Sequence, residues 1–292
     1  MERKKYALVT GGGRGIGKGI ALRLGQEGYN VAITYRNSQE GALEVQQKLR
    51  EMGSDTEIFR ADMSDIAQVN AAFDEYEKRY QYIDLLVNNA GVTMASSFLD
   101  TTPELFDTVV NTDLRGVFFM AQRAAKYMIK QHCEGCIINI SSNQGCTQFD
   151  NFSVYGSVKT AVTKLTRHMA MELSKYNIRV NSLAPGVVDT GWMEKSRNTE
   201  RYKRYMKYDA LTPLGSYAIP SQVAGIIVFL ASDDAIYITG EEIVADGGAR
   251  LPVIMDVPAE WVPSPAPDKP ESILIKNRGK NKSPCSFVAF PL

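Results

Sequence analysis

The chain has few cysteines and histidines for its length, and neither sign of charge prevails. Its 292 residues include 4 cysteines and 2 histidines. Four thiols in a chain of this size do not make a disulfide scaffold, so we expect a reducing compartment, the cytoplasm. Lysine plus arginine equals aspartate plus glutamate at 33 each. This balance gives no overall attraction to nucleic acid or to an anionic membrane, so we expect neither as a partner.

Long hydrophobic runs are also missing. No apolar run approaches the roughly 20 residues that span a bilayer. The charged start, Met1–Lys5, leads directly into a short apolar run, so we expect no signal peptide. The apolar fraction of 44% and the charged fraction of 23% are ordinary for a globular domain. Membrane, disordered and small secreted classes are therefore not expected.

Proline is rare except at one end of the chain. Eight of the twelve prolines lie in residues 252–292. Such a composition does not form regular core elements, so we expect residues 251–292 to be an irregular, extended or disordered tail. We expect residues 1–250 to form a single domain.

Short apolar runs alternate with longer amphipathic segments up to about residue 250. Residues 6–9 are typical of a buried strand, and Ile16, Ile20 and Leu24 follow at helical spacing. This alternation predicts an α/β fold, a doubly wound parallel sheet with helices on both faces and a ligand at the carboxyl edge of the strands. Further strands are expected near residues 31–34, 57–60, 83–87, 136–140, 178–183 and 242–245, and helices near 39–52, 66–80, 103–131, 155–176 and 221–231.

A glycine-rich turn joins the first strand to the first helix. It reads Thr10-Gly11-Gly12-Gly13-Arg14-Gly15-Ile16-Gly17. Glycines let the backbone turn tightly and approach a pyrophosphate, and a helix N-terminus offers unpaired N–H groups. Such a turn can also be a plain connection, but its place between strand and helix favours a nucleotide site.

Tyr155 and Lys159 stand four residues apart in a predicted helix and therefore share a face. A neighbouring ammonium favours the phenolate, which makes the phenol more useful in acid–base catalysis. Ser142 ends the preceding strand, where its hydroxyl can hold a substrate oxygen while charge develops on it. The Tyr–Lys spacing alone is common on surface helices; together with the serine and the glycine turn it predicts a catalytic site.

Five motifs together resemble the short-chain dehydrogenase/reductase family over about residues 5–250. They are the T-G-x-x-x-G-x-G turn, Asn88-Asn89-Ala90-Gly91, Tyr155-Gly156-Ser157-Val158-Lys159, Pro185–Thr190 and the closing segment Ser232–Gly248. The resemblance implies a single Rossmann-type domain that binds a nicotinamide cofactor and commonly assembles as a tetramer or dimer. It also implies that Ser142, Tyr155 and Lys159 are the catalytic residues of a reaction in which a hydride passes between the cofactor and a ketone or secondary alcohol.

The resemblance also implies which residues bind the cofactor. Asp62 would face the adenine, Asn89 the adenosine side, and Val188 and Thr190 the nicotinamide amide. Asp62 could equally belong to the cap of the next helix. The full expected set is Gly11, Arg14, Gly15, Ile16, Gly17, Tyr35, Arg36, Asp62, Met63, Asn89, Ala90, Gly91, Tyr155, Lys159, Pro185, Gly186, Val188 and Thr190.

The end of the second strand bears on the choice of nucleotide. A carboxylate there would bond both ribose hydroxyls and repel a 2′-phosphate. Tyr35 takes this place, Arg36 follows it, and Arg14 lies in the glycine turn. Two guanidinium groups and no acid favour a phosphate, so we predict NADP(H). The alternative is that Arg36 is a solvated charge at the end of a strand.

One position departs from the family pattern. The family's N-L-x-G-V-F stretch begins here with Asp113. In the family the asparagine holds a water through its main-chain carbonyl, a role that an aspartate would keep. A carboxylate near Lys159 would raise the pKa of the lysine and offset part of its effect on Tyr155. We therefore group Asp113 with the catalytic residues.

The segments after Ser142 and after Thr190 bear on the substrate. Polar residues after Ser142 favour a polar substrate such as a sugar, polyol or ring ketone. The basic residues within 195–207 suggest either an anionic substrate or a solvated lid helix. The expected substrate-binding residues are Ser142, Gln144, Gln148, Tyr155 and Trp192.

Two alternative functions stay open. One is a 3-oxoacyl-carrier reductase whose carrier would dock on the basic segment. The other is an NADPH-binding sensor or scaffold without turnover. Cys133-Glu134-Gly135-Cys136 resembles half of a metal site, but it lacks a second pair, so we expect a structural turn and no metal.

Overall fold

The computed structural model describes residues 3–191, 199, 202–203, 212–215 and 217–251. By compactness the chain divides into two units, Met1–Pro252 and Val253–Leu292. All described residues belong to the first unit. Of the tail predicted over 251–292, only Leu251 is among the described residues.

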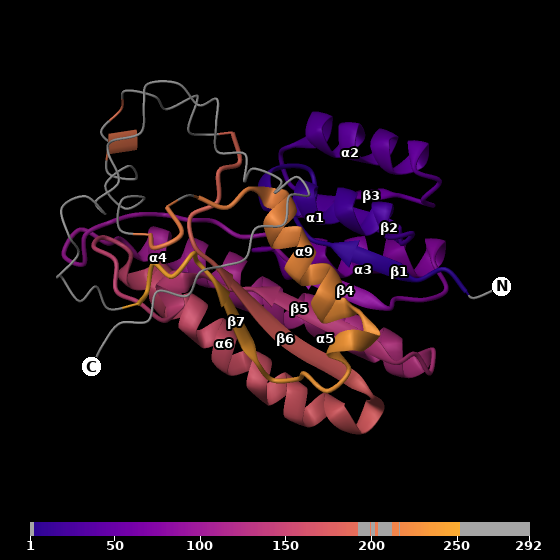
Figure 1. Cartoon of the computed structure of the whole chain (residues 1–292). Coiled ribbons are helices and arrows are strands. Elements are labelled where there is room, and N and C mark those ends of the chain that lie inside the picture. Colours follow the sequence, from indigo (N-terminus) through magenta and orange to yellow (C-terminus); the bar gives the residue numbers. More distant parts are fainter. Residues whose placement is uncertain (1–2, 192–198, 200–201, 204–211, 216, 252–292) are drawn as a thin grey trace, which may run out of the picture. The chain divides into compact units, whose positions relative to one another are not determined.

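The described part of the first unit is built on a seven-stranded sheet in the order β3-β2-β1-β4-β5-β6-β7 (Figure 1). All neighbouring strands are parallel, which confirms the predicted doubly wound α/β fold. The strand order reverses between β1 and β4, and in such sheets the crevice at the carboxyl ends of these strands takes the ligand. The strands are β1 (Tyr6–Val9), β2 (Asn30–Tyr35), β3 (Ile58–Arg60), β4 (Leu85–Asn88), β5 (Gly135–Ile140), β6 (Ile178–Pro185) and β7 (Glu242–Ala245).

Helices cover both faces of the sheet and enclose one core on each side. Helices α1, α2 and α9 pack on one face, and α3, α5 and α6 pack on the other (Figure 1). Side chains along a strand alternate between the two cores: Ala7 and Val9 lie in the first and Leu8 in the second. The helices are α1 (Gly15–Gln26), α2 (Gln39–Glu51), α3 (Ile66–Arg79), α4 (Pro103–Val110), α5 (Gly116–Lys130), α6 (Ser153–Leu173) and α9 (Pro220–Ala231), and the short turns are η1 (Asn111–Arg115), η2 (Asn143–Gly145), η3 (Ser174–Tyr176) and η4 (Asp233–Ala235).

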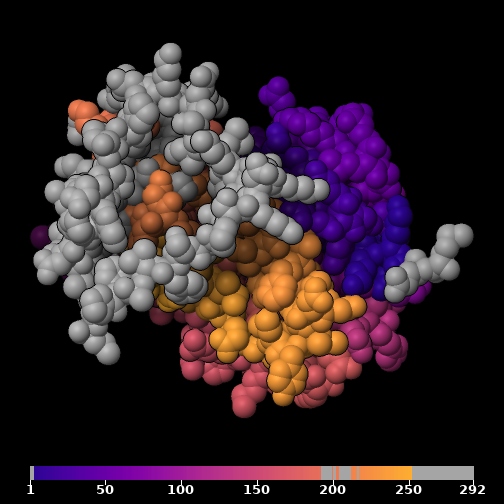
Figure 2. Space-filling view, viewed as in Figure 1, coloured from indigo at the N-terminus to yellow at the C-terminus, as the bar shows by residue number. Residues whose placement is uncertain are grey.

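The first and last helices of this unit pack against each other. An added Cβ at Gly19 of α1 would lie 2.5 Å from Cβ of Pro220 of α9. The two helices can approach this closely because position 19 has no side chain. Figure 2 shows the result as an orange surface lying beside the indigo N-terminal elements. No described helix is both long enough and apolar enough to cross a membrane.

The predicted helix over 103–131 is interrupted. Pro103 lies in the first turn of α4, as predicted, and Thr102 caps that helix by accepting a hydrogen bond from the Leu105 N–H at 3.3 Å. The π-helical turn η1 then separates α4 from α5. A π-turn inserts one residue into a helix and rotates the side chains that follow it. It carries Asp113, whose side chain is fully buried.

Candidate active site

The glycine turn after β1 leaves the first turn of α1 open to an anion. Gly11 and Gly15 adopt left-handed backbone, with φ of 66° and 56°. An added Cβ at Gly17 would lie 2.3 Å from the Gly11 carbonyl oxygen, so only glycine lets the helix start so close to the turn. No side chain caps α1, and its first turn holds no acidic residue. Its N–H groups therefore fit the pyrophosphate of a dinucleotide.

Asn89 connects this turn to the loop after β4. Its Nδ2 donates to the carbonyl oxygens of Thr10 at 2.9 Å and Gly11 at 3.3 Å. Thr10 Oγ1 in turn accepts from the N–H groups of Asn89 at 2.9 Å and Ala90 at 3.0 Å. The loop after β6 reaches the same turn, because an added Cβ at Gly15 would lie 3.4 Å from Thr190 Cγ2. Three loops predicted to bind the cofactor thus meet at one place.

The two arginines predicted to recognise a 2′-phosphate are both exposed, Arg14 at the start of α1 and Arg36 after β2. Arg36 Nη1 lies 3.5 Å from Asp62 Oδ2. The end of β2 itself carries no acid, but a carboxylate from the loop after β3 lies beside Arg36. Arg60 at the end of β3 also donates to the Arg36 carbonyl at 3.4 Å.

Asp62 is held in its own turn and does not cap the next helix. Its Oδ1 accepts from the N–H of Ser64 at 2.9 Å and from its hydroxyl at 2.8 Å. Burial raises the pKa of Asp62, but the hydrogen bonds from Ser64 and the Arg36 charge outweigh burial, so the pKa is lowered. Asp65 is the residue that caps α3.

The other predicted cofactor residues differ in how far they are buried. Tyr35 and Val188 belong to one core and Met63 to the other, so their side chains serve mainly in packing. The partly buried or exposed members of the set are Ile16, Ala90, Gly91, Gly186 and Thr190.

Ser142 lies at the start of η2, which packs directly on α6. Its Oγ accepts from the Gln144 N–H at 3.2 Å. Thr160 Oγ1 donates to the Gly145 carbonyl at 2.7 Å, and an added Cβ at Gly156 would lie 2.9 Å from the Gln144 carbonyl oxygen. The fold therefore brings the predicted serine against the first turns of α6, which carry Tyr155 and Lys159.

Lys159 is buried, and its ammonium has three neighbours in the part of the chain that the structure describes. Nζ lies 3.0 Å from Asp113 Oδ2, donates to the Ile140 carbonyl at 3.1 Å, and lies 5.5 Å from the centre of the Tyr155 ring. Burial lowers the pKa of Lys159, but the charges of Asp113 and of an ionised Tyr155 outweigh it, so the pKa is raised. A charged ammonium thus lies beside the phenol.

Asp113 contacts the lysine with its side chain, whereas the sequence indicated only a backbone role and a nearby charge. Its Oδ1 accepts from the Val92 N–H at 2.8 Å. Its Oδ2 has no hydrogen-bond partner besides the ammonium among the described residues. The carboxylate is therefore shared between the loop after β4 and the lysine.

The substrate side is only partly described. Gln144 Oε1 is buried without a hydrogen-bond partner among the described residues, and Gln148 is exposed. Trp192 and most of the basic segment 195–207 lie outside the described residues. Cys133 and Cys136 are free thiols, and no cluster of histidine, cysteine and carboxylate side chains in the described part could hold a metal ion.

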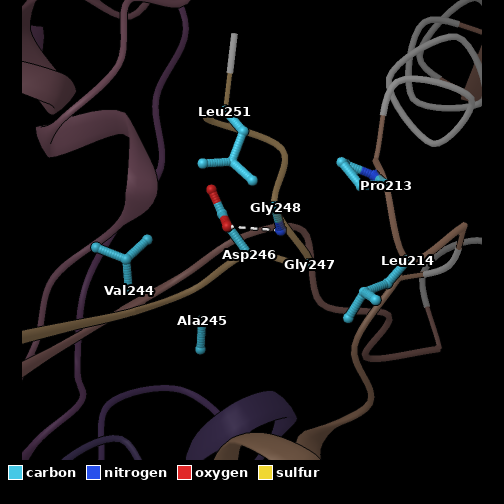
Figure 3. A pocket seen from close by; sticks show the side chains of 8 residues that line it. All are labelled: Pro213, Leu214, Val244, Ala245, Asp246, Gly247, Gly248 and Leu251. Atoms are coloured by element: carbon cyan, nitrogen blue, oxygen red, sulfur yellow. Dashed lines mark hydrogen bonds between the residues drawn. The ribbon is translucent and has the colours of Figure 1, made fainter. Parts of the chain in front are cut away.

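An open hollow of about 440 Å³ lies at the end of β7 (Figure 3). Asp246 Oδ1 accepts from the Gly248 N–H at 3.0 Å beside it. None of the predicted catalytic or cofactor residues lines this hollow, so we do not include it in the candidate site. Its lining residues are Pro213, Leu214, Val244, Ala245, Asp246, Gly247, Gly248 and Leu251.

Known proteins resemble this chain over most of its length. The sequence profile of the family described as enoyl-(acyl carrier protein) reductase matches residues 11–250. A 3-oxoacyl-[acyl-carrier-protein] reductase from Staphylococcus aureus is 38% identical over 253 residues, which cover 86% of this chain and 100% of that protein.

Solved structures also resemble this chain over most of its length. The acetoin dehydrogenase from Enterobacter cloacae superposes with a TM-score of 0.80 at 30% identity, covering 88% of this chain and 100% of that one. A short chain dehydrogenase from Burkholderia cenocepacia, solved in complex with NADP, gives a TM-score of 0.77 at 31% identity, covering 84% and 97%.

Proposed function

Because the chain belongs to the short-chain dehydrogenase/reductase family, we propose that it is an NADP(H)-dependent oxidoreductase that interconverts a ketone and a secondary alcohol. The observation that carries the proposal is the buried ammonium of Lys159, 5.5 Å from the Tyr155 ring, with Ser142 on a turn packed against the same helix. The substrate is a polar small molecule such as a sugar, polyol or ring ketone. The active form is a homodimer or homotetramer.

Three side chains would control the reacting oxygen. A bound nicotinamide nucleotide supplies the hydride. In reduction, Tyr155 donates its proton to the carbonyl oxygen as that oxygen becomes an alcohol. Ser142 donates a hydrogen bond to the same oxygen and stabilises the charge that develops there. The ammonium of Lys159 stabilises the phenolate left behind, and in oxidation that phenolate takes the proton back.

Three observations support a nicotinamide dinucleotide, and the last two favour NADP(H) in particular. The uncapped start of α1 suits a pyrophosphate, and the exposed guanidinium groups of Arg14 and Arg36 suit a 2′-phosphate. A relative of known structure was solved with NADP. The carboxylate of Asp62 beside Arg36 offsets part of this charge, so the preference rests on both arginines together.

Carrier-linked 3-oxoacyl reduction is the second candidate, because the relative from Staphylococcus aureus aligns over its whole length. The two candidates differ in the substrate that is turned over fastest. Assays with NADPH and a panel of sugars, cyclic ketones and acetoacetyl-pantetheine distinguish them. A higher kcat/KM for the thioester would favour the second candidate.

The test of the proposed chemistry is Tyr155→Phe. Phenylalanine keeps the ring but has no proton to transfer, so we expect kcat to fall about 10²- to 10⁴-fold while NADPH affinity changes little. Steady-state kinetics and NADPH fluorescence titration measure the two effects. Tyr176→Phe is the matched control, since Tyr176 is exposed just beyond the same helix. Full activity in Tyr155→Phe would refute the proposal.

A further inference from the structure

The pair formed by Lys159 and Asp113 is sealed from solvent. Their side chains are 5% and 0% exposed. A buried charge is costly unless an opposite charge lies beside it. The charged or titratable groups that face the ammonium are Asp113 from η1 and Tyr155 from α6, and the Ile140 carbonyl faces it from β5. Among the described residues, Asp113 is therefore the carboxylate that balances the ammonium.

The place of the carboxylate depends on two features of the backbone. The π-turn η1 contains Asp113 and presents it to the interior. On the opposite side, an added Cβ at Gly91 would lie 2.7 Å from Asp113 Oδ2. The carboxylate fits there because position 91 lacks a side chain. Together with the Val92 N–H on Oδ1, this couples the loop after β4 to the lysine.

We propose that Asp113 is a positioning residue that acts through Lys159, fixing the ammonium between η1, β5 and Tyr155 and keeping it charged in a site closed to water. An amide at this position would keep the shape and the hydrogen bond from Val92 but would lack the charge. The catalytic consequence rests on the proposed function, whereas the ion pair itself does not. The two are therefore tested separately.

The first experiment is a double-mutant cycle on thermal stability. Lys159→Met leaves a buried carboxylate without a counter-ion, so we expect Tm to fall by about 10 °C. Lys159→Met combined with Asp113→Asn removes both charges, and most of the loss should be recovered. Asp107→Asn, an exposed position on α4, is the control and should not restore Tm. Additive effects in the cycle would overturn the proposal.

The second experiment is the pH profile of kcat/KM for alcohol oxidation in Asp113→Asn. Without the carboxylate, only the charge of an ionised Tyr155 opposes the effect of burial on the pKa of Lys159. The alkaline limb, where the ammonium loses its proton, should therefore move to lower pH by about 1 to 3 units. A purely structural role would lower activity without moving the limb, and an unmoved limb would overturn the proposal. If the wild type turns over no alcohol or ketone, the proposed function is wrong, and the thermal cycle alone decides the ion pair.

Discussion

At the residue scale, the charges around Arg36 bear on the choice between the two nicotinamide nucleotides. Its guanidinium lies 3.5 Å from the Asp62 carboxylate and is 44% exposed. An exposed pair of this kind is weak, so the arginine remains able to bind a second anion. Arg14 lies in the glycine turn, directly before the first turn of α1. A 2′-phosphate between them would be held by two cations against one anion.

Arg36→Ala should raise the KM for NADPH about 10- to 100-fold, because a hydrogen bond to a charged group contributes about 1.5–3 kcal/mol. The KM for NADH, which has no 2′-phosphate, should change little. Steady-state kinetics with both nucleotides measure the difference. Arg50→Ala, on the exposed face of α2, removes a charge elsewhere and should leave both values unchanged. An equal rise in KM for NADPH and for NADH would show that Arg36 does not bind the 2′-phosphate.

The sequence was informative about residue types at the site and less so about their contacts. It predicted Tyr155 and Lys159 on one helical face because four residues make about one turn. It indicated a charge at Asp113 near the lysine. It did not reveal that Oδ2 would touch Nζ, because the two residues are 46 positions apart and the approach depends on Gly91 and on η1. The pairing of Arg36 with Asp62 was not predicted either. These residues follow β2 and β3, whose carboxyl ends come together only when the two strands pair in the sheet.

At the element scale, the start of α1 depends on a missing side chain. Gly17→Ala would place a methyl group 2.3 Å from the Gly11 carbonyl oxygen and 2.4 Å from Asn89 Nδ2. The helix must shift away from the turn, so we expect stability to fall by about 1–3 kcal/mol and NADPH affinity to fall at least about 10-fold. Urea unfolding and fluorescence titration measure these losses.

Gly225→Ala is the matched control for that substitution. Gly225 also lies within a helix, α9, but the nearest atom to an added Cβ is Arg23 Nη1 at 3.9 Å. Alanine is favoured over glycine in helices by about 1 kcal/mol, so this variant should be as stable as the wild type or slightly more stable. If Gly17→Ala and Gly225→Ala have the same stability and the same NADPH affinity, the close approach at Gly17 is not required for the turn.

The elements themselves were largely predictable from hydrophobic pattern. Most strands are buried along their length, and several therefore form short apolar runs, such as residues 6–9 and 31–33. The break at η1 could not be predicted, because a single inserted residue hardly disturbs the helical spacing of apolar side chains over 103–131. The direct contact between Lys159 Nζ and the carboxylate of Asp113, which lies in this turn, was therefore not predicted either.

At the scale of the whole molecule, stability should fall in alkaline solution. Burial raises the pKa of the Cys136 thiol from 9.0 to about 11. Between these values the unfolded chain loses the proton and the folded chain keeps it, so the free energy of unfolding falls as pH rises. This stabilisation is fully present below pH 9, and about 2–3 kcal/mol of it has been lost once pH exceeds 11.

Cys136→Ala removes this ionisation. The stability difference between wild type and variant should therefore shrink by about 2–3 kcal/mol between pH 8.5 and 11, measured by urea unfolding at each pH. Cys133→Ala is the control: that thiol is partly exposed, so its effect should be smaller. Parallel stability curves for wild type and Cys136→Ala would contradict the assignment.

The contacts of Asn89 and Thr10 have a consequence for the thermodynamics of association. They join the loops after β1 and β4 through four hydrogen bonds within the chain itself. A crevice whose walls are already joined is preorganised, so a nucleotide entering it orders little additional backbone. The affinity then reflects the contacts that the nucleotide makes, because these two loops add only a small entropic penalty.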